Sequence, residues 1–302
     1  MLKSMYSGIS GMKANQTKMD VVGNNVANVG TTSFKKSSTR FSDTLYQTSM
    51  YSGAPSEDIG GTGGINPAQI GMGTKVSGIF KNTVRGNIQT TGRSSDLAID
   101  GDGYFKVQIG KDKFAYTRDG SFNIDKNGDL VTAAGYKVVD TDNKPINIPT
   151  DKDGRKVLSY KISSEGEISL ILSGSTNTVT NPGDGEETKP GEGEGTNPGE
   201  GTNTYAETQE QAKNQKLNIA VFKNPEGLEA LSGNLYGVSV NSGNPIENAT
   251  YGNIEQGAIE MSNVDLSEEF TEMIVTTRAF QASSKVITTS DELLQEIINL
   301  KR

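Results

Sequence analysis

Apolar side chains recur three or four residues apart at the start of the chain, and polar side chains fill the gaps between them. This period matches the turn of an α-helix and collects the apolar positions on one face. Gly30 and the residues that follow it end the pattern, so we predict an amphipathic helix over residues 1–30. Its apolar stripe consists of Leu2, Met5, Ile9, Met12, Met19, Val22 and Val26.

A second apolar stripe runs through residues 262–302 with a seven-residue repeat, the spacing that is typical of coiled coils. We predict a helix here with Ser262 or Asn263 as its cap, because such side chains accept hydrogen bonds from the first turn. Acidic residues follow the cap and basic residues end the segment. Each charge is favourable there, because the N-terminus of the helix dipole is positive and its C-terminus is negative. The stripe consists of Leu266, Phe270, Met273, Phe280, Ile287, Leu294 and Ile298.

Between the helices, apolar and polar residues alternate with the period of two that predicts β-strands. Glycine-containing turns separate these strands, and we expect tight hairpins there because glycine adopts positive φ readily. The strands are predicted at 97–99, 104–107, 136–139, 168–172, 219–222 and 235–240. The turns are predicted at 100–103, 118–120, 126–129 and 134–135. Residues 31–90, rich in Gly, Ser and Thr, are predicted to be mainly loop with short strands.

These patterns predict an α+β fold in which the terminal helices form a coiled-coil-like stalk and the middle is β-rich. Residues 181–203 are an imperfect acidic Pro-Gly repeat without apolar side chains other than proline, which predicts a disordered insertion. The predicted segments are an N-terminal helix (1–30), the first part of a β-rich domain (31–148), an outer insertion (149–215), a return segment (216–261) and a C-terminal helix (262–302).

The two amphipathic helices at the chain ends need partners, because helical stability in water comes mostly from packing. Pairing the two helices within one chain would bury one seam and give a simple two-helix stalk. Packing against other copies would bury more of each stripe. The sequence leaves both arrangements open.

The amino-acid composition excludes most classes of catalytic site. The 302 residues include no Cys and no His, which excludes thiolate nucleophiles, His-based triads and Cys- or His-ligated metals. The net charge of −8 disfavours nucleic-acid binding, which needs a basic surface. No apolar run reaches the ~20 residues of a membrane span, and the N-terminus lacks the apolar core of a secretory signal. We therefore expect no enzyme, no cofactor, no nucleic-acid partner and no membrane insertion.

Two glycine-rich motifs superficially resemble ligand sites. Asp100-Gly101-Asp102-Gly103 begins like a calcium loop, but Tyr104 stands where a ligand is required and Lys111 stands at the twelfth position. Residues 60–64 (GGTGG) lack the Lys-Ser/Thr pair of a phosphate loop. We expect a tight turn at the first motif and irregular structure at the second.

Three long motifs resemble bacterial flagellar rod and hook proteins. They are MYSGISGMKANQTKMDVVGNNVANVGTTSFK (5–35), SDLAIDGDGYFKV (95–107) followed by YTRDGSFNIDKNGDLVTAAGYKV (116–138), and SNVDLSEEFTEMIVTTRAFQASSKVITTSDELLQEIINL (262–300). The resemblance implies terminal helices that form concentric tubes around an export channel and a β-domain that forms the tube wall. The flagellar type III apparatus would export the chain without a cleaved signal, and the chain would reside in the hook or basal body outside the cell.

Within this family the resemblance favours the hook subunit, which forms a curved tube that passes torque from rod to filament. A distal rod subunit is the alternative, and a secreted adhesin with a coiled-coil stalk is a third interpretation from another class. The implied partners are identical copies, rod proteins, the hook cap and the hook–filament junction proteins. Two features depart from the hook pattern. Thr277 stands where Gln commonly precedes the Arg, and the insertion is of low complexity where many hook proteins carry a folded outer domain.

Overall fold

The computed structural model describes residues 2–55, 63–111, 113–149, 151–152, 155–172, 209–246 and 251–300. The chain divides into two compact units, each assembled from segments that are distant in sequence. Unit 1 comprises Met1–Thr90, Val221–Ala249 and Ile259–Arg302, and unit 2 comprises Thr91–Ala220 and Thr250–Ala258. The predicted α+β class is confirmed. The acidic repeat at 181–203 lies outside the described residues, as does most of the predicted outer insertion.

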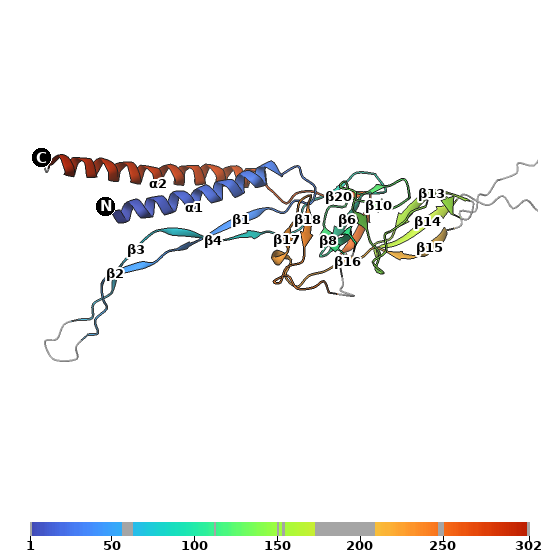
Figure 1. The fold of residues 1–302 in the computed structure, drawn as a ribbon, viewed down its shortest axis with the longest axis horizontal. Coiled ribbons are helices and arrows are strands. Elements are labelled where there is room, and N and C mark those ends of the chain that lie inside the picture. The colour runs from blue at the N-terminus through green and yellow to red at the C-terminus, as the bar shows by residue number, and fades with distance from the viewer. Residues whose placement is uncertain are drawn as a thin grey trace, which may run out of the picture. The chain divides into compact units, whose positions relative to one another are not determined.

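Unit 1 contains both helices, α1 (Leu2–Ala27) and α2 (Leu266–Leu300), lying side by side in antiparallel orientation (Figure 1). The two helices expected at the chain ends are confirmed to within a few residues at each boundary. The predicted cap of α2 is wrong. Asp265 performs this role, since its Oδ1 atom accepts hydrogen bonds from the backbone N of Ser267 at 2.8 Å and of Glu268 at 3.4 Å.

The segment predicted to be mainly loop forms long two-stranded ribbons in unit 1. Strand β1 (Ser37–Asp43) pairs antiparallel with β4 (Thr74–Lys81), and β2 (Tyr46–Met50) pairs antiparallel with β3 (Ala68–Gly71). Half-buried and exposed positions alternate along most of β1 and β4, so one face of this ribbon is partly covered. The remaining elements of unit 1 are β5 (Ile88–Thr90), a 3₁₀ turn (Pro225–Gly227), β17 (Glu229–Ala230), β18 (Leu235–Gly237) and most of β20 (Ala258–Glu260).

Unit 2 is built around β7 (Tyr104–Gly110), which pairs antiparallel with three other strands. Those strands are β8 (Lys113–Thr117), β11 (Lys137–Val138) and β16 (Ile219–Ala220). Beyond β11 lie β10 (Leu130–Val131) and β9 (Asn123–Ile124). A second sheet has the order β12 (Asp151–Lys152), β13 (Arg155–Ile162), β14 (Glu167–Leu172) and β15 (Gln209–Lys216). Strand β6 (Leu97–Asp100) pairs with β19 (Asn253–Gln256).

Two of the four predicted hairpin turns are confirmed. Residues 126–129 join β9 to its partner β10, and residues 134–135 join β10 to its partner β11, with Gly128 and Gly135 at positive φ. The turns at 100–103 and 118–120 are not hairpins. Residues 100–103 connect β6 to β7, which belong to different sheets, and residues 118–120 connect β8 to β9, which do not pair with each other.

Unit 2 has a conventional apolar core. The rings of Phe105 and Phe122 meet edge to face with their centroids 5.2 Å apart, and both side chains are fully buried. Strand alternation places these and other apolar side chains on inward faces. The other large side chains buried in unit 2 are Leu97, Ile99, Val107, Leu130, Val138, Val139, Ile146, Leu170 and Leu217.

Candidate assembly site

Small residues form the contact between α1 and α2. A Cβ atom added at Gly8 would lie 3.1 Å from Cγ1 of Ile287 and 3.3 Å from the carbonyl oxygen of Ser283. A Cβ atom added at Gly11 would lie 3.1 Å from the Ser283 hydroxyl oxygen. Glycine at these two positions lets the helices approach each other closely. The predicted apolar stripe of α1 contributes neither residue.

Buried polar groups join the end of α1 to the beginning of α2. Asn25 is 1% exposed, and its Nδ2 atom donates to the carbonyl oxygen of Ser37 at 2.8 Å and to Oε2 of Glu269 at 3.0 Å. The Oδ1 atom of Asn25 accepts from the backbone N of Ser37 at 3.0 Å. One asparagine therefore connects α1, β1 and α2, with all its polar atoms in use.

A buried ion pair lies close to these contacts in unit 1. The Nζ atom of Lys35 lies 2.5 Å from Oε1 of Glu260, and the two side chains are 2% and 0% exposed. Lys35 also donates to the carbonyl oxygen of Val84 at 3.0 Å, and Glu260 accepts from the backbone N of Gly86 at 2.9 Å. These extra hydrogen bonds compensate for the cost of removing both charges from water.

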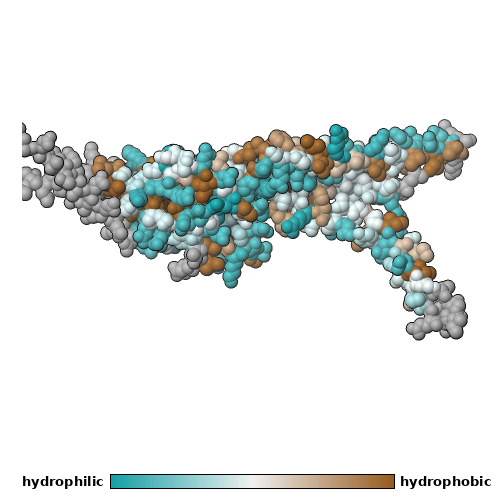
Figure 2. Space-filling view, turned by 180° about the vertical axis from the view of Figure 1, so that it is seen from behind, coloured by the Kyte–Doolittle hydropathy of each residue, from teal (hydrophilic) through white to brown (hydrophobic). Residues whose placement is uncertain are grey.

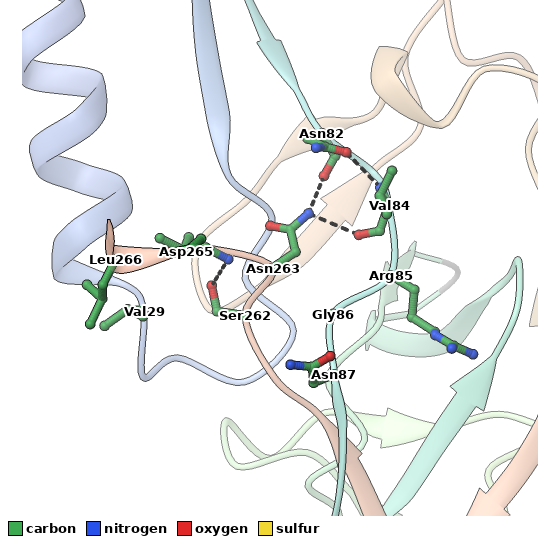
Figure 3. Close-up of a pocket in the computed structure, with 11 residues that line it drawn as sticks. Val29, Asn82, Val84, Arg85, Gly86, Asn87, Ser262, Asn263, Asp265 and Leu266 are labelled. Atoms are coloured by element: carbon green, nitrogen blue, oxygen red, sulfur yellow. Dashed lines mark hydrogen bonds between the residues drawn. The ribbon is translucent and has the colours of Figure 1, made fainter. Parts of the chain in front are cut away.

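Asn263 connects the segment before α2 to the two other chain segments that meet here. Its Oδ1 atom accepts from the backbone N of Lys36 at 2.8 Å. Its Nδ2 atom donates to the carbonyl oxygens of Asn82 at 2.9 Å and Val84 at 3.0 Å (Figure 3). We call Asn25, Lys35, Glu260, Asn263 and Glu269 the polar junction. Because its members are buried or bonded to backbone, the polar junction fixes where both helices leave the rest of unit 1.

An ion pair at the edge of the polar junction adds a weaker link. The Nζ atom of Lys36 lies 2.6 Å from Oε2 of Glu268, and this hydrogen bond raises the pKa of Lys36 above its ordinary value against the opposing effect of burial. The Glu268 side chain is 58% exposed, so water screens the pair. We therefore assign the fixed geometry here to the buried polar junction.

Large apolar side chains remain exposed along α2. Val275, Val286, Leu293 and Ile297 lie eleven, seven and four residues apart, so they share one helix face, and they are 42–59% exposed. A second set begins at the start of the helix, where Leu266, Phe270 and Ile274 are 39%, 50% and 63% exposed. Figure 2 shows brown, apolar surface along the helical part of unit 1. Large exposed apolar patches on soluble proteins mark interaction sites.

The pairing of the helices covers only part of the predicted stripes. On α2, Met273, Phe280, Ile287 and Leu294 are half-buried, whereas Leu266, Phe270 and Ile298 are exposed. On α1, Val22 is buried, Met5, Met12, Met19 and Val26 are half-buried, and Ile9 is 38% exposed. The side chain of Leu2 lies outside the described residues. Contact of these stripes with other copies stays a prediction.

Sequence reasoning missed both the glycine contact and the polar junction. Ser4, Gly8 and Gly11 form a small-residue series on one side of α1, and the hydroxyl oxygen of Ser4 lies 3.4 Å from that of Ser290. This series is visible in the sequence as residues four and three apart, so it could have predicted the close contact. The polar junction could not have been found in this way, because its members come from four separate segments.

A cavity of about 480 Å³ lies beside the polar junction in unit 1. Residues 82 and 84–87 form one wall, and residues 262–266 with Val29 form the other (Figure 3). The apolar side chains that line the cavity are Val29, Val84, Val264 and Leu266. We call this cavity the base pocket, because it lies where α2 begins.

The described part of the chain contains no cluster of three or more Asp or Glu residues placed to hold a metal ion. Within the same part, no helix combines the length and the apolar character that a membrane span requires. The structural features described in unit 1 are a close helix contact, a buried polar junction, exposed apolar helix faces and a pocket.

Three family models match the chain in the expected order. The model described as "Flagella basal body rod protein" matches residues 5–35, "Flagellar hook protein FlgE/F/G D1 domain" matches residues 98–170, and "Flagellar basal body rod FlgEFG protein C-terminal" matches residues 255–300.

Full-length relatives carry rod and hook names. The chain is 43% identical over 308 residues to the flagellar basal-body rod protein FlgG of Bacillus subtilis, covering all of both chains. It is 34% identical to the flagellar basal-body rod protein FlgG of Borreliella burgdorferi, again over all of both chains. It is 30% identical to the flagellar hook protein FlgE of Borreliella burgdorferi, with an alignment that spans 445 residues.

Proposed function

The chain belongs to the flagellar rod and hook protein family, and we propose that within this family it is a subunit of the distal rod. The family consists of structural subunits, so the chain is a flagellar structural protein. The observation that carries the narrower proposal is the similarity over the whole length to a basal-body rod protein at 43% identity. The two sequences align over 308 residues, close to the 302 residues of this chain.

The alignment with the hook protein favours the rod over the hook interpretation made from the sequence. It spans 445 positions, more than the 302 residues of this chain can fill, so the hook relative carries a large insertion that this chain lacks. The low-complexity insertion that departs from the hook pattern agrees with this comparison. The rod interpretation, kept as the alternative at the sequence level, is therefore the better supported of the two.

Exposed apolar faces on α2 supply the physical basis for assembly. Burial of apolar surface is the main favourable term in protein association, at about 25 cal/mol per Å². Val275, Val286, Leu293 and Ile297 offer such surface along the length of one helix. In our proposal, identical copies cover these faces and the terminal helices form the inner layer of a tube. The polar junction holds the helices at a fixed angle, so that repeated copies can adopt one geometry.

The proposal places the chain in the flagellar basal body outside the inner membrane, after export by the flagellar type III apparatus. Its partners are identical copies, rod subunits on one side and hook subunits on the other. The hook cap and hook–filament junction proteins, expected for a hook subunit, are not partners in this proposal. The chain acts by passing torque as a rigid element and performs no catalysis.

Electron microscopy of basal bodies from cells that lack the chain tests the proposal. We expect the distal rod to be absent together with everything beyond it, and a plasmid copy of the chain to restore both. A complete rod that lacks only the curved hook would identify a hook subunit and contradict the proposal. Complete rods and hooks would contradict both interpretations.

A further inference from the structure

One face of α1 is exposed along most of the helix. A series of exposed side chains recurs there three or four residues apart, the spacing that keeps residues on one side of a helix. Gly23 continues the series, and no atom lies within 4 Å of a Cβ atom added at this glycine. We call the series the outer stripe of α1. It consists of Tyr6, Ile9, Lys13, Gln16, Asp20, Gly23 and Ala27.

A series with the same spacing runs along α2. Its members are exposed and recur four and three residues apart, so they also share one helix face. We call it the outer stripe of α2, and it consists of Arg278, Ala282, Lys285, Thr289, Glu292, Glu296 and Asn299. The exposed aliphatic side chains of Val286, Leu293 and Ile297 each follow a member of the stripe by one residue, so they border it along one edge.

The charges on the two outer stripes have equal spacing and complementary signs. On α1, Lys13 precedes Asp20 by seven residues, and on α2, Lys285 precedes Glu292 by seven residues. In an antiparallel pair of helices, the order of residues on one stripe is reversed relative to the other. The register that places Lys13 opposite Glu292 therefore also places the aspartate of α1 opposite the lysine of α2.

These four charged side chains are without partners in the part of the chain that the structure describes. No ion pair or side-chain hydrogen bond joins any of them to another described residue. The other two charged residues of α1 are engaged within the chain. Lys3 donates a hydrogen bond to the side-chain oxygen of Gln47, and the Nζ atom of Lys18 lies 3.3 Å from Oε2 of Glu272.

The same charges disfavour the neighbouring registers. A displacement of one heptad in one direction would bring Lys13 opposite Lys285. The same displacement in the other direction would bring Asp20 opposite Glu292. Like charges that face each other across a contact suppress that arrangement, whereas complementary charges fix the register. The antiparallel register defined above is therefore the one that gives two opposite-charge pairs.

The two outer stripes of one chain cannot meet in this register. A Cβ atom added at Gly11 lies 3.9 Å from Cβ of Ser283, so these two positions lie level with each other. Five residues further along each helix, Gln16 lies level with Arg278. The register of the charges instead places Gln16 opposite Thr289, which is eleven residues, or about 16 Å, from Arg278 along α2. The contact needs a second copy.

We propose that the outer stripe of α1 in one copy packs antiparallel against the outer stripe of α2 in a second copy, displaced by about 16 Å along the helices. This inference rests on the proposed self-assembly and names the surfaces that perform it. Burial of the aliphatic side chains that border the α2 stripe drives the contact, and the charges select its register. Two different surfaces meet, so the contact is heterologous and extends as an open helical polymer where it does not close into a ring.

Disulfide trapping tests the register, because the chain has no cysteine of its own. Copies with Gln16→Cys and copies with Thr289→Cys are expressed together as a minority beside the unmodified chain, which carries the assembly. Both positions are exposed, so neither substitution disturbs a buried side chain. Isolated basal bodies are then oxidised, and two cysteines bridge only when their Cα atoms come within about 7 Å. We expect a cross-linked dimer on a non-reducing gel only when both variants are present.

A matched control combines Gln16→Cys with Ala282→Cys. Ala282 is exposed on the same stripe and lies seven residues, or about 10 Å, from Thr289, so we expect no dimer. A dimer from the control pair, or rods that contain Gln16→Cys and Thr289→Cys copies and give no dimer, would overturn the proposed contact and leave the rod assignment intact. Dimers from one variant alone would overturn it as well. Failure of the unmodified chain to enter any rod would instead overturn the proposed function.

Exchange of the charges gives a second test in cells that contain only the variant chain. Lys13→Glu places two carboxylates opposite each other at every contact, so we expect several-fold fewer complete rods per cell, and Lys13→Glu with Glu292→Lys should restore them. The matched control, Lys13→Glu with Asp291→Lys, has the same net charge, but Asp291 lies about 100° around the helix from Glu292 and should restore nothing. Equal recovery in both double variants, or normal rods with Lys13→Glu alone, would contradict the proposed pairing.

Discussion

The core of unit 2 and the helix pair of unit 1 are stabilised by different interactions. In unit 2, Phe105, Phe122 and Leu97 are fully buried. In the helix pair, Gly8 and Gly11 of α1 lie against Ser283 and Ile287 of α2, and large apolar side chains such as Phe270 and Ile297 stay half exposed. Unit 2 therefore has a buried apolar core, whereas the helix pair leaves large apolar side chains exposed.

The two regions therefore depend on different interactions for their stability. Apolar side chains fill the core of unit 2, so we expect this unit to be stable in the dilute monomer. The polar junction fixes only the base of the helices, and the rest of each helix depends on packing that a single chain provides in part. Variants that alter one region and leave the other unchanged test whether the two regions differ in this way.

The largest expected difference in the free energy of unfolding is between variants of two phenylalanines. Phe105→Ala removes a fully buried ring and should lower the free energy of unfolding by about 3–5 kcal/mol. Phe270→Ala removes a ring that is 50% exposed and should change it by no more than about 0.5 kcal/mol, because exposed positions rarely contribute more. Urea denaturation of the dilute monomer measures both. Similar losses for the two variants would contradict the comparison.

The second expected effect concerns the buried ion pair. Lys35→Met removes the ammonium group that lies 2.5 Å from the buried Glu260 carboxylate and should cost roughly 3 kcal/mol of stability in unit 1. The pair between Lys18 and Glu272 is partly exposed, so Lys18→Met, the matched control, should cost less than about 1 kcal/mol. The double variant Lys35→Met with Glu260→Leu should recover much of the loss. Amide exchange of the β1 and β4 peptides reports these changes, and equal costs for the two lysines would refute the role assigned to the polar junction.

A third prediction distinguishes two glycines of α1. Gly8→Leu places a side chain where a Cβ atom alone lies 3.1 Å from Ile287, and should destabilise the helix pair by about 1–3 kcal/mol. At Gly23 no atom lies within 4 Å of the added Cβ, so Gly23→Leu should stabilise the helix by up to about 1 kcal/mol through its higher propensity. Helical signal in circular dichroism during thermal unfolding measures both. Stabilisation by both substitutions would show that the helices do not rely on this close contact.

The smallest expected effect is a pH dependence in unit 2. Burial alone would raise the pKa of Asp129, but hydrogen bonds from Lys137 and Asn147 outweigh it and lower the pKa below its ordinary value of 3.8. A carboxylate with a depressed folded pKa contributes stability above its unfolded pKa, and this contribution fades as the pH falls through the folded value. Asp129→Asn should therefore cost about 1 kcal/mol at pH 7.

Urea midpoints at several pH values check this last prediction. The difference between Asp129→Asn and the unmodified chain should be constant from pH 7 to about pH 5 and should shrink below the ordinary aspartate pKa. A difference that grows as the pH falls would contradict the stated sign.

The sequence predicts the helices and several strands well because their signals are local. The heptad of Met273, Phe280 and Ile287 is visible without any partner, and each of these residues is half-buried in the structure. Residues 31–90 were predicted as loop with short strands, and the pairing of β1 with β4 was not predicted because it joins residues about forty apart, such as Ser37 with Lys81. The strand pattern of one segment contains no information about such a distant partner.

The candidate site was only partly predictable for a related reason. Hydrophobic periodicity identifies the most apolar face of a helix. In α1 that face includes Ile9, which is exposed. It does not include Gly8 and Gly11, which lie against α2. The preference for rod over hook in our proposal comes from the full-length comparison, because the terminal segments resemble both.

Amide hydrogen exchange in the dilute monomer and in isolated rods tests whether the end of α2 is covered only when copies assemble. In the monomer we expect peptides of α2 from residues 291–300 to exchange as quickly as an unprotected chain, while peptides containing Phe105 stay protected. In rods we expect both sets of peptides to be protected. Equal protection of residues 291–300 in the monomer and in rods would show that the helices are already complete within one chain, and would contradict the account.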